Sequence, residues 1–126
     1  MGSPNDREKM APAVATLGDF GIDVDERVLS AHRTPDEVAA LARSGRDEGY
    51  VAFICGAGMA AHLAGAVAAH TTLPVVGVPL TSSASVAGGL DAMLAIAQMP
   101  PGVPVACVAV NGARNAAILA ARIIDV

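Results

Sequence analysis

Large aromatic rings and basic residues are scarce in this sequence. Among its 126 residues there are no tryptophan, one tyrosine and two phenylalanines, so alanine, valine and leucine must fill most of the interior. The formal net charge is −4, and no stretch is polybasic. Nucleic acids and anionic membranes both require a positive surface, so the sequence argues against either partner. A phosphorylated small molecule needs only one or two local donors and stays compatible with this charge.

Several signatures of catalysis and targeting are also missing. Lys9 is the only lysine, which argues against Schiff-base chemistry, and the sequence has no Cys/His metal cluster, no Gly-Lys-Ser/Thr phosphate loop and no Gly-x-Ser-x-Gly elbow. Cys55 and Cys107 lie inside apolar runs and are predicted to be buried free thiols rather than a disulfide. The charged opening is unlike a signal peptide, and no apolar run approaches the ~20 residues that span a bilayer. We therefore expect a cytoplasmic protein.

Apolar runs alternate with segments of helical periodicity along the chain. This alternation predicts one α/β domain, residues 1–126, in which a parallel sheet is covered by helices on both faces. Asn5 and Glu8 have the spacing of a helix-capping box, Gly21 follows an expected helix end, and Thr34-Pro35 is typical of a capped helix start. The expected strands are 23–29, 51–55, 75–78 and 103–110, and the expected helices are 6–20, 35–48, 59–70, 90–97 and 113–124.

Three segments with polar residues and glycines, 2–6, 30–35 and 56–62, fall on expected strand-to-helix turns. In a doubly wound sheet, ligands bind beyond the carboxyl ends of the strands, where such turns meet. In the first segment, Ser3 and the neighbouring backbone could bind an anion, and Asp6 could accept hydrogen bonds from sugar hydroxyls. The alternative is that these residues only cap the first helix.

The second segment contains Ser30, His32 and Arg33. Arg33 stands at a strand end beside a helix start, a good position for binding a phosphate. Imidazole is the side chain that exchanges protons near neutral pH without a large pKa shift. A lone histidine is more often a structural residue, but the place of His32 between Ser30 and Arg33 favours a catalytic role.

The third segment is rich in glycine. Gly56 and Gly58 would let the backbone approach a planar ligand or a carboxylate, although the pattern lacks the full dinucleotide fingerprint. His62, expected one turn into the next helix, is either a ligand contact or a residue of the helix face. His70, near the end of that helix, is expected to be structural and to interact with the helix C-terminus.

These segments together resemble the class I N5-carboxyaminoimidazole ribonucleotide mutases. The matching motifs follow the order of that family over the whole chain: 1–6 (Met-Gly-Ser-x-x-Asp), 30–35 (Ser-Ala-His-Arg-Thr-Pro), 56–63 (Gly-Ala-Gly-x-Ala-Ala-His-Leu), 73–79 (Leu-Pro-Val-Val-Gly-Val-Pro), 98–100 (Gln-Met-Pro) and 115–116 (Asn-Ala).

The resemblance implies a flavodoxin-like three-layer sandwich with a parallel sheet of order 2-1-3-4-5, in a cytoplasmic homo-octamer. It implies an enzyme of purine biosynthesis that uses no cofactor, metal, nucleotide or ATP. The reaction would move a carboxylate from the exocyclic nitrogen to a ring carbon of aminoimidazole ribonucleotide. Its substrate is a small-molecule ribonucleotide.

By position, the resemblance also implies roles for residues of this chain. Ser3 and Arg33 would hold the 5′-phosphate with Ser30 close by, and Asp6 would hold the ribose hydroxyls. His32 would be the proton shuttle. The segment 56–62, with Gly58 and His62, would form the wall of the pocket.

Three positions depart from the family pattern, which has serine at Asn5, glycine at Met59 and proline at Ala64. A bulky Met59 is expected to crowd the pocket or to require an altered backbone. The family also has a central strand before the position of Met1 and a helix after that of Val126. We therefore expect the chain to be a fragment, or its start to have been assigned too late.

Two other functions stay open at this stage. One is direct carboxylation of aminoimidazole ribonucleotide by carbon dioxide in the same fold. The other is a catalytically inactive subunit that binds the ribonucleotide or supports assembly, which Met59 and the absent strand would favour.

Overall fold

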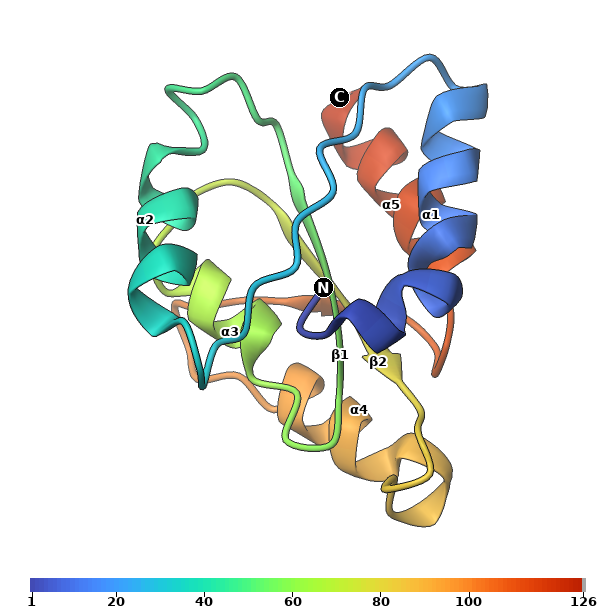
Figure 1. The fold of residues 1–126 in the computed structure, drawn as a ribbon. Coiled ribbons are helices and arrows are strands. Elements are labelled where there is room, and N and C mark those ends of the chain that lie inside the picture. Colours follow the sequence, from blue (N-terminus) through green and yellow to red (C-terminus); the bar gives the residue numbers. More distant parts are fainter. Residues whose placement is uncertain (126) are drawn as a thin grey trace.

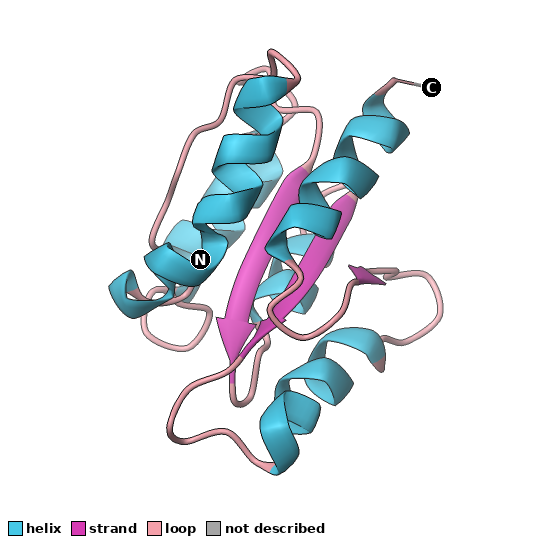
Figure 2. Cartoon of the chain, turned by 90° about the vertical axis from the view of Figure 1, so that its right-hand side faces the viewer, coloured by secondary structure: helices cyan, strands magenta, loops and turns pink. Residues whose placement is uncertain are grey.

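The computed structural model describes residues 1–125 and contains a parallel sheet between helical layers (Figures 1 and 2). Strands β1 and β2 pair in parallel over six residues, from Phe53 with Val75 to Gly58 with Leu80. Strand β3 pairs with β2 at only two positions, so the order is β1-β2-β3. The elements in chain order are η1 (Pro4–Asp6), α1 (Arg7–Asp19), α2 (Pro35–Ser44), β1 (Phe53–Gly58), α3 (Leu63–Ala68), β2 (Val75–Leu80), η2 (Ala87–Gly89), α4 (Leu90–Ala97), β3 (Ala106–Cys107) and α5 (Ala113–Ile124).

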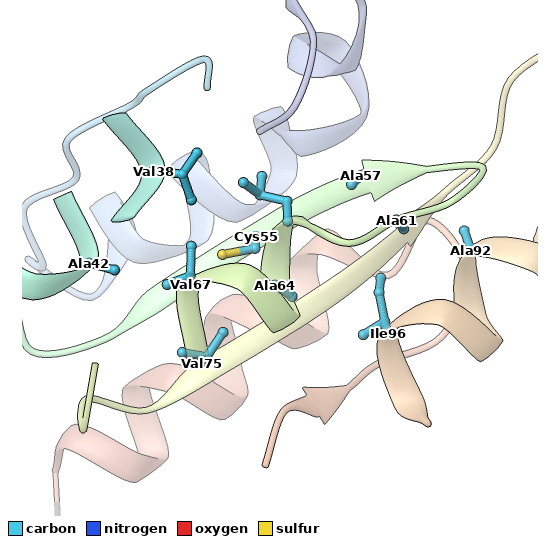
Figure 3. Close-up of a cluster of buried hydrophobic side chains, with 11 residues drawn as sticks. Val38, Ala42, Cys55, Ala57, Ala61, Ala64, Val67, Val75, Ala92 and Ile96 are labelled. Carbon is cyan, nitrogen blue, oxygen red and sulfur yellow. The ribbon is translucent and has the colours of Figure 1, made fainter. Parts of the chain in front are cut away.

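Two apolar clusters fill the space on either side of the sheet. On one face, α1 packs against α5, and both helices cover β2 through residues such as Met10, Leu17 and Ala117. On the other face, α2, α3 and α4 contribute a second cluster that includes Val38, Val67 and Ile96 (Figure 3). Alanine dominates both clusters, which lets helices and strands approach closely without aromatic side chains. The expected α/β architecture is confirmed.

Strand β2 is the centre of this arrangement. All six of its residues are buried, as expected for a parallel strand with helices on both faces. Gly77 is required here, because a Cβ at this position would collide with the side chain of Ile96 on α4. The unbroken apolar run 75–80 therefore becomes the most protected element of the sheet.

The start of α1 differs from the prediction. The side chain of Ser3, not that of Asn5, caps the chain by accepting the Asn5 N–H at 3.2 Å. Pro4 then opens a 3-10 turn, since its fixed φ suits a first helical position. The expected capping box of Asn5 and Glu8 is wrong, whereas the expected end is confirmed by Gly21, whose φ is +72°.

Two expected strands are shorter or absent. The segment 23–29 is extended but is not a strand, because a strand needs a partner and, within the described residues, the main chain of this segment bonds only to Met1. The expected strand 103–110 is reduced to Ala106–Cys107, and Pro104 has no N–H to offer a ladder. Within the described residues, no helix is long and apolar enough to cross a membrane.

Candidate active site

Main-chain hydrogen bonds bring the three polar turns to the carboxyl edge of the sheet. The Met1 carbonyl accepts the Leu29 N–H at 3.0 Å, and the Gly2 N–H donates to the Gly56 carbonyl at 3.1 Å. Residues 1–2 are therefore bonded to Leu29, which directly precedes Ser30, and to Gly56 in β1. Ser3 follows these two residues. The predicted convergence of segments 2–6, 30–35 and 56–62 has a main-chain basis.

The turn that carries His32 and Arg33 is closed by its own side chains. The Thr34 N–H donates to the Ser30 carbonyl at 2.8 Å, and the Thr34 hydroxyl also donates to that carbonyl at 3.0 Å. The Ser30 hydroxyl accepts the Arg33 N–H at 3.1 Å. Thr34 was expected to cap α2, but its side chain makes no cap hydrogen bond because it is used in this turn.

His32 and His62 form a pair across two of these turns. Nε2 of His32 lies 2.8 Å from Nδ1 of His62, so one of these nitrogens donates a hydrogen bond to the other. The rings meet edge to face, with centroids 4.9 Å apart. Both side chains are exposed, so a ligand at this edge can reach them. His62 lies just before α3 rather than one turn into it, and this position directs it toward His32.

The glycines of the third turn have a steric role. A Cβ on Gly58 would lie 2.9 Å from the main-chain oxygen of Leu80, which cannot move without disturbing β2. The next residue, Met59, has a φ of +52°, a left-handed conformation that glycine adopts far more easily. The Met59 carbonyl accepts the Ala61 N–H at 2.9 Å and so helps to form the turn that presents His62. Met59 thus occupies a strained backbone position beside the histidine pair.

Two charged groups of the site differ in their surroundings. Partial burial raises the pKa of the Asp6 carboxyl, against the opposing effects of the amino-terminal ammonium, the Ser3 main chain and Lys9. Arg33 is exposed, and within residues 1–125 its guanidinium makes no hydrogen bond or ion pair. An anionic ligand would therefore meet a guanidinium whose donors are not already used.

A hydrogen-bonded pair of residues beyond β2, Thr81 and Asn111, was not predicted from the sequence. The Thr81 N–H donates to Oδ1 of Asn111 at 3.1 Å, and Nδ2 of Asn111 donates to the Thr81 hydroxyl at 2.8 Å. Lys9 donates from Nζ to the Thr81 carbonyl. Thr81 directly follows strand β2, and a polar residue at a strand end is the feature of the sequence that could have indicated this pair. This pair ties the ends of β2 and β3 together and connects them to the start of α1.

His70 and the cysteines have structural positions. Nδ1 of His70 lies 2.9 Å from the Ala66 carbonyl in the last turn of α3, which confirms the expected interaction with the helix end. Both cysteines are free thiols as predicted, Cys55 fully in the core and Cys107 partly buried. Burial raises the pKa of the Cys55 thiol to about 12.

An α/β fold with a histidine pair and an exposed arginine at the carboxyl edge of the sheet is typical of a small-molecule enzyme of the doubly wound class. The family model described as AIR carboxylase matches residues 1–126, and the chain belongs to this family.

Known relatives and structures agree with this assignment. The chain is 53% identical over 126 residues to the N5-carboxyaminoimidazole ribonucleotide mutase of Saccharolobus solfataricus, covering 100% of the chain and 78% of that protein. It is 48% identical over 126 residues to the mutase of the same name from Pyrococcus abyssi, covering 100% of the chain and 71% of the relative. The crystal structure of Treponema denticola PurE superposes with a TM-score of 0.82 at 29% identity, over 99% of this chain and 77% of that one. The expected flavodoxin-like fold is confirmed.

Proposed function

We propose that this chain converts N5-carboxyaminoimidazole ribonucleotide to 4-carboxyaminoimidazole ribonucleotide in purine biosynthesis. The relatives at about 50% identity carry the name of this mutase. The observation that carries the catalytic assignment is the contact between His32 and His62 at the carboxyl edge of the sheet, on the turn that also carries the exposed Arg33.

The ribonucleotide has two polar ends for which this edge offers partners. Arg33 supplies charge-assisted hydrogen bonds to the 5′-phosphate, and the hydroxyls of Ser3 and Ser30, which lie on two of the converging turns, share that group. Asp6 accepts hydrogen bonds from the ribose hydroxyls. An ionised carboxylate accepts these bonds best, so the raised pKa of Asp6 favours ribose binding above the acidic range.

His32 acts first as an acid and then as a base. Its imidazolium protonates the exocyclic nitrogen while the C–N bond breaks and carbon dioxide leaves. The ring carbon then forms a C–C bond to the retained carbon dioxide, and neutral His32 removes the proton from that carbon. The proton count returns to its starting value, so no external acid, base or oxidant is consumed.

His62 and Gly58 complete the reaction chamber. The hydrogen bond between Nε2 of His32 and Nδ1 of His62 fixes the orientation of the His32 ring. In this proposal the turn around Gly58 is one wall of the substrate pocket and, with the ligand bound, retains the carbon dioxide. The residues of this chain supply every proton that the reaction needs, so the proposed mechanism includes no cofactor.

The subunit is proposed to work in the cytoplasm as part of a homo-octamer. Support comes from exposed apolar side chains on and just before α4, namely Val86, Leu90 and Leu94, which are 65%, 46% and 48% exposed. Such a row is typical of a subunit contact. Light scattering of the purified protein would give the number of subunits.

A second candidate is direct carboxylation of aminoimidazole ribonucleotide, which the description of the matching family favours. The two activities differ in their carbon source. A mutase acts on the carboxyamino compound without added bicarbonate, whereas a direct carboxylase needs aminoimidazole ribonucleotide and carbon dioxide.

The decisive experiment follows the ultraviolet absorbance of the imidazole during conversion of the carboxyamino compound by wild type and His32→Asn. General acid–base catalysis contributes about 10²- to 10⁴-fold, so the variant should lose turnover on that scale while its circular dichroism stays unchanged. Full activity of His32→Asn would overturn the assigned role. Inactivity of a folded wild-type protein that still binds the ribonucleotide would indicate a non-catalytic subunit.

A further inference from the structure

Met59 has a backbone conformation that its side chain disfavours. Its φ is +52°, and within residues 1–125 the only other non-glycine residues with positive φ are Ala87 and Asn111. Asparagine enters this left-handed region more easily than other L-residues do, whereas a long side chain is an outlier there. Such conformations persist where the surrounding structure fixes the backbone, and they concentrate at functional sites.

The chain on both sides of Met59 fixes this conformation. Gly58 pairs with β2 in the parallel ladder, and a Cβ on it would lie 2.9 Å from a main-chain oxygen of that strand. After Met59, the Ala61 N–H donates to the Met59 carbonyl at 2.9 Å. The His62 N–H donates to the Ala60 carbonyl at 2.8 Å. Ala61 is 1% exposed and anchors the turn in the interior (Figure 3), so Met59 cannot relax without disturbing β1 or His62.

The packing of the domain does not compensate for this strain. The side chain of Met59 is 51% exposed and belongs to neither of the two core clusters. Met10, by contrast, is 5% exposed and is part of the cluster that α1 and α5 form with β2. Met59 is the only exposed methionine among residues 1–125. The strained turn thus presents an apolar side chain whose contacts are still to be made with a bound molecule.

The same turn carries one member of the histidine pair. His62 follows Met59 by three positions, and its Nδ1 lies 2.8 Å from Nε2 of His32. In the proposed reaction the aminoimidazole ring of the ribonucleotide lies at this pair. Methionine suits a contact with a planar ring, because its unbranched side chain adapts its shape and its polarizable sulfur interacts favourably with aromatic systems. The turn therefore provides such a ring with a polar and an apolar partner.

We propose that Met59 is a substrate-binding residue whose side chain packs against the aminoimidazole ring and contributes to selectivity for that ring. The inference rests on the proposed function, since it concerns the substrate of the same site. Burial of the exposed thioether against the ring stabilises the complex and offsets the backbone strain that the free protein retains. A ligand with the ribose and the phosphate but without the ring does not make this contact.

Oxidation by hydrogen peroxide detects the contact without turnover. Peroxide transfers one oxygen to the thioether and leaves as water, and mass spectrometry of peptides locates the sulfoxide. In the free protein Met59 should be oxidised first and the buried Met10 should resist. Aminoimidazole ribonucleotide, at a concentration that calorimetry shows to be saturating, should slow oxidation of Met59 at least about threefold. Saturating ribose 5-phosphate should leave the rate unchanged.

Three variants separate the side chain from the backbone strain. Met59→Gly should weaken binding of aminoimidazole ribonucleotide about 3- to 10-fold and leave binding of ribose 5-phosphate within about twofold, measured by calorimetry. Met59→Leu keeps an apolar side chain of similar volume and should bind the ribonucleotide within about twofold of wild type. Ala87→Gly is the control, because it relieves the same left-handed strain at an exposed position outside this turn, and it should bind both ligands like wild type.

The outcomes separate this inference from the proposed function. Four results would overturn the contact and leave the mutase assignment standing: an unreactive Met59 in the free protein, no protection by the bound ribonucleotide, equal protection by ribose 5-phosphate, or equal ribonucleotide affinities of wild type and Met59→Gly. Protection in a protein that does not convert the carboxyamino compound would support the contact and contradict the mutase. A folded protein that does not bind the ribonucleotide would overturn both.

Discussion

At the carboxyl edge of the sheet, His32, Arg33 and His62 are exposed and lie on turns that are closed by hydrogen bonds, whereas the side chains of the interior behind them are held by apolar packing. Among the described residues, that interior contains no buried polar or charged side chain. The residues that form the site are therefore different from the residues that stabilise the fold, although short turns connect the two groups. Substitutions in the interior should change the free energy of unfolding, and substitutions at the edge should change kinetics.

The largest expected loss of stability comes from Ile96→Ala. Ile96 is 0% exposed and fills the space next to Gly77, so its truncation leaves a cavity at the centre of the domain. Such substitutions cost about 2–5 kcal/mol of unfolding free energy, measurable by urea denaturation. Leu94→Ala on the same helix is the control, since Leu94 is 48% exposed and should lose less than about 0.5 kcal/mol. An equal loss at both positions would mean that Leu94 is buried in an assembly.

Substitution of Arg33 by alanine at the edge should change the kinetics and leave the free energy of unfolding almost unchanged. Hydrogen bonds to charged groups contribute about 1.5–3 kcal/mol, so the loss of this guanidinium should raise KM roughly 10- to 100-fold. The unfolding free energy should stay within about 0.5 kcal/mol, because the side chain is exposed. Arg43→Ala, on an exposed position of α2, is the control. A fall in kcat at constant KM would contradict a phosphate-binding role.

The sequence predicts the interior better than the edge, for a physical reason. The run 75–80 is apolar at every position, and only a strand between two helical layers satisfies it. Thr34-Pro35 correctly marks a helix start, because proline fits a first turn in most surroundings. Both features depend on residues that are neighbours in the sequence, so they can be predicted from the sequence alone.

Partners that are distant in the chain cannot be predicted in this way. Segment 23–29 has the pattern of a strand, but the pattern contains no information on whether a neighbour is present. Thr34 has the right type and spacing for a cap, but Ser30 competes successfully for its hydroxyl. The contact between His32 and His62 joins residues thirty positions apart, and only the fold brings their rings together. The roles of these residues are therefore implied only by the family resemblance, and their contacts are known only from the structure.

Met59 bears on both the interior and the carboxyl edge. The strain of its backbone lowers the stability of the domain, and it lies in the turn that presents His62. Its φ of +52° costs about 1–2 kcal/mol for a side chain with a Cβ, and glycine removes this cost at some entropic loss in the unfolded state. Met59→Gly should therefore raise the unfolding free energy by about 1 kcal/mol. Ala60→Gly is the control and should lower it slightly, since Ala60 has no positive φ. A loss of stability in Met59→Gly would show that the methionine side chain contributes packing that outweighs the strain.

The smallest effect concerns Cys55, whose pKa of about 12 reflects burial in the apolar interior. A thiol in the unfolded chain ionises near pH 8.5, so above that pH the unfolded state loses protons first and becomes relatively more favourable. The stability contributed by the protonated thiol is complete below about pH 8.5 and declines as the pH rises toward 12. By pH 9 the decline should reach about 0.8 kcal/mol.

This decline can be isolated by comparing variants, because other groups also titrate in this range. Cys55→Ala should be less stable than wild type at pH 7 through lost packing, and the difference should shrink by the same amount at pH 9. Cys107→Ala is the control. Cys107 is only partly buried, so it is less desolvated than Cys55, although burial raises its pKa as well. Removal of Cys107 should therefore change the pH dependence less than removal of Cys55. Parallel curves for wild type and Cys55→Ala would mean that the Cys55 thiol reaches water in the native state, and that the interior is less sealed from the edge than the static packing indicates.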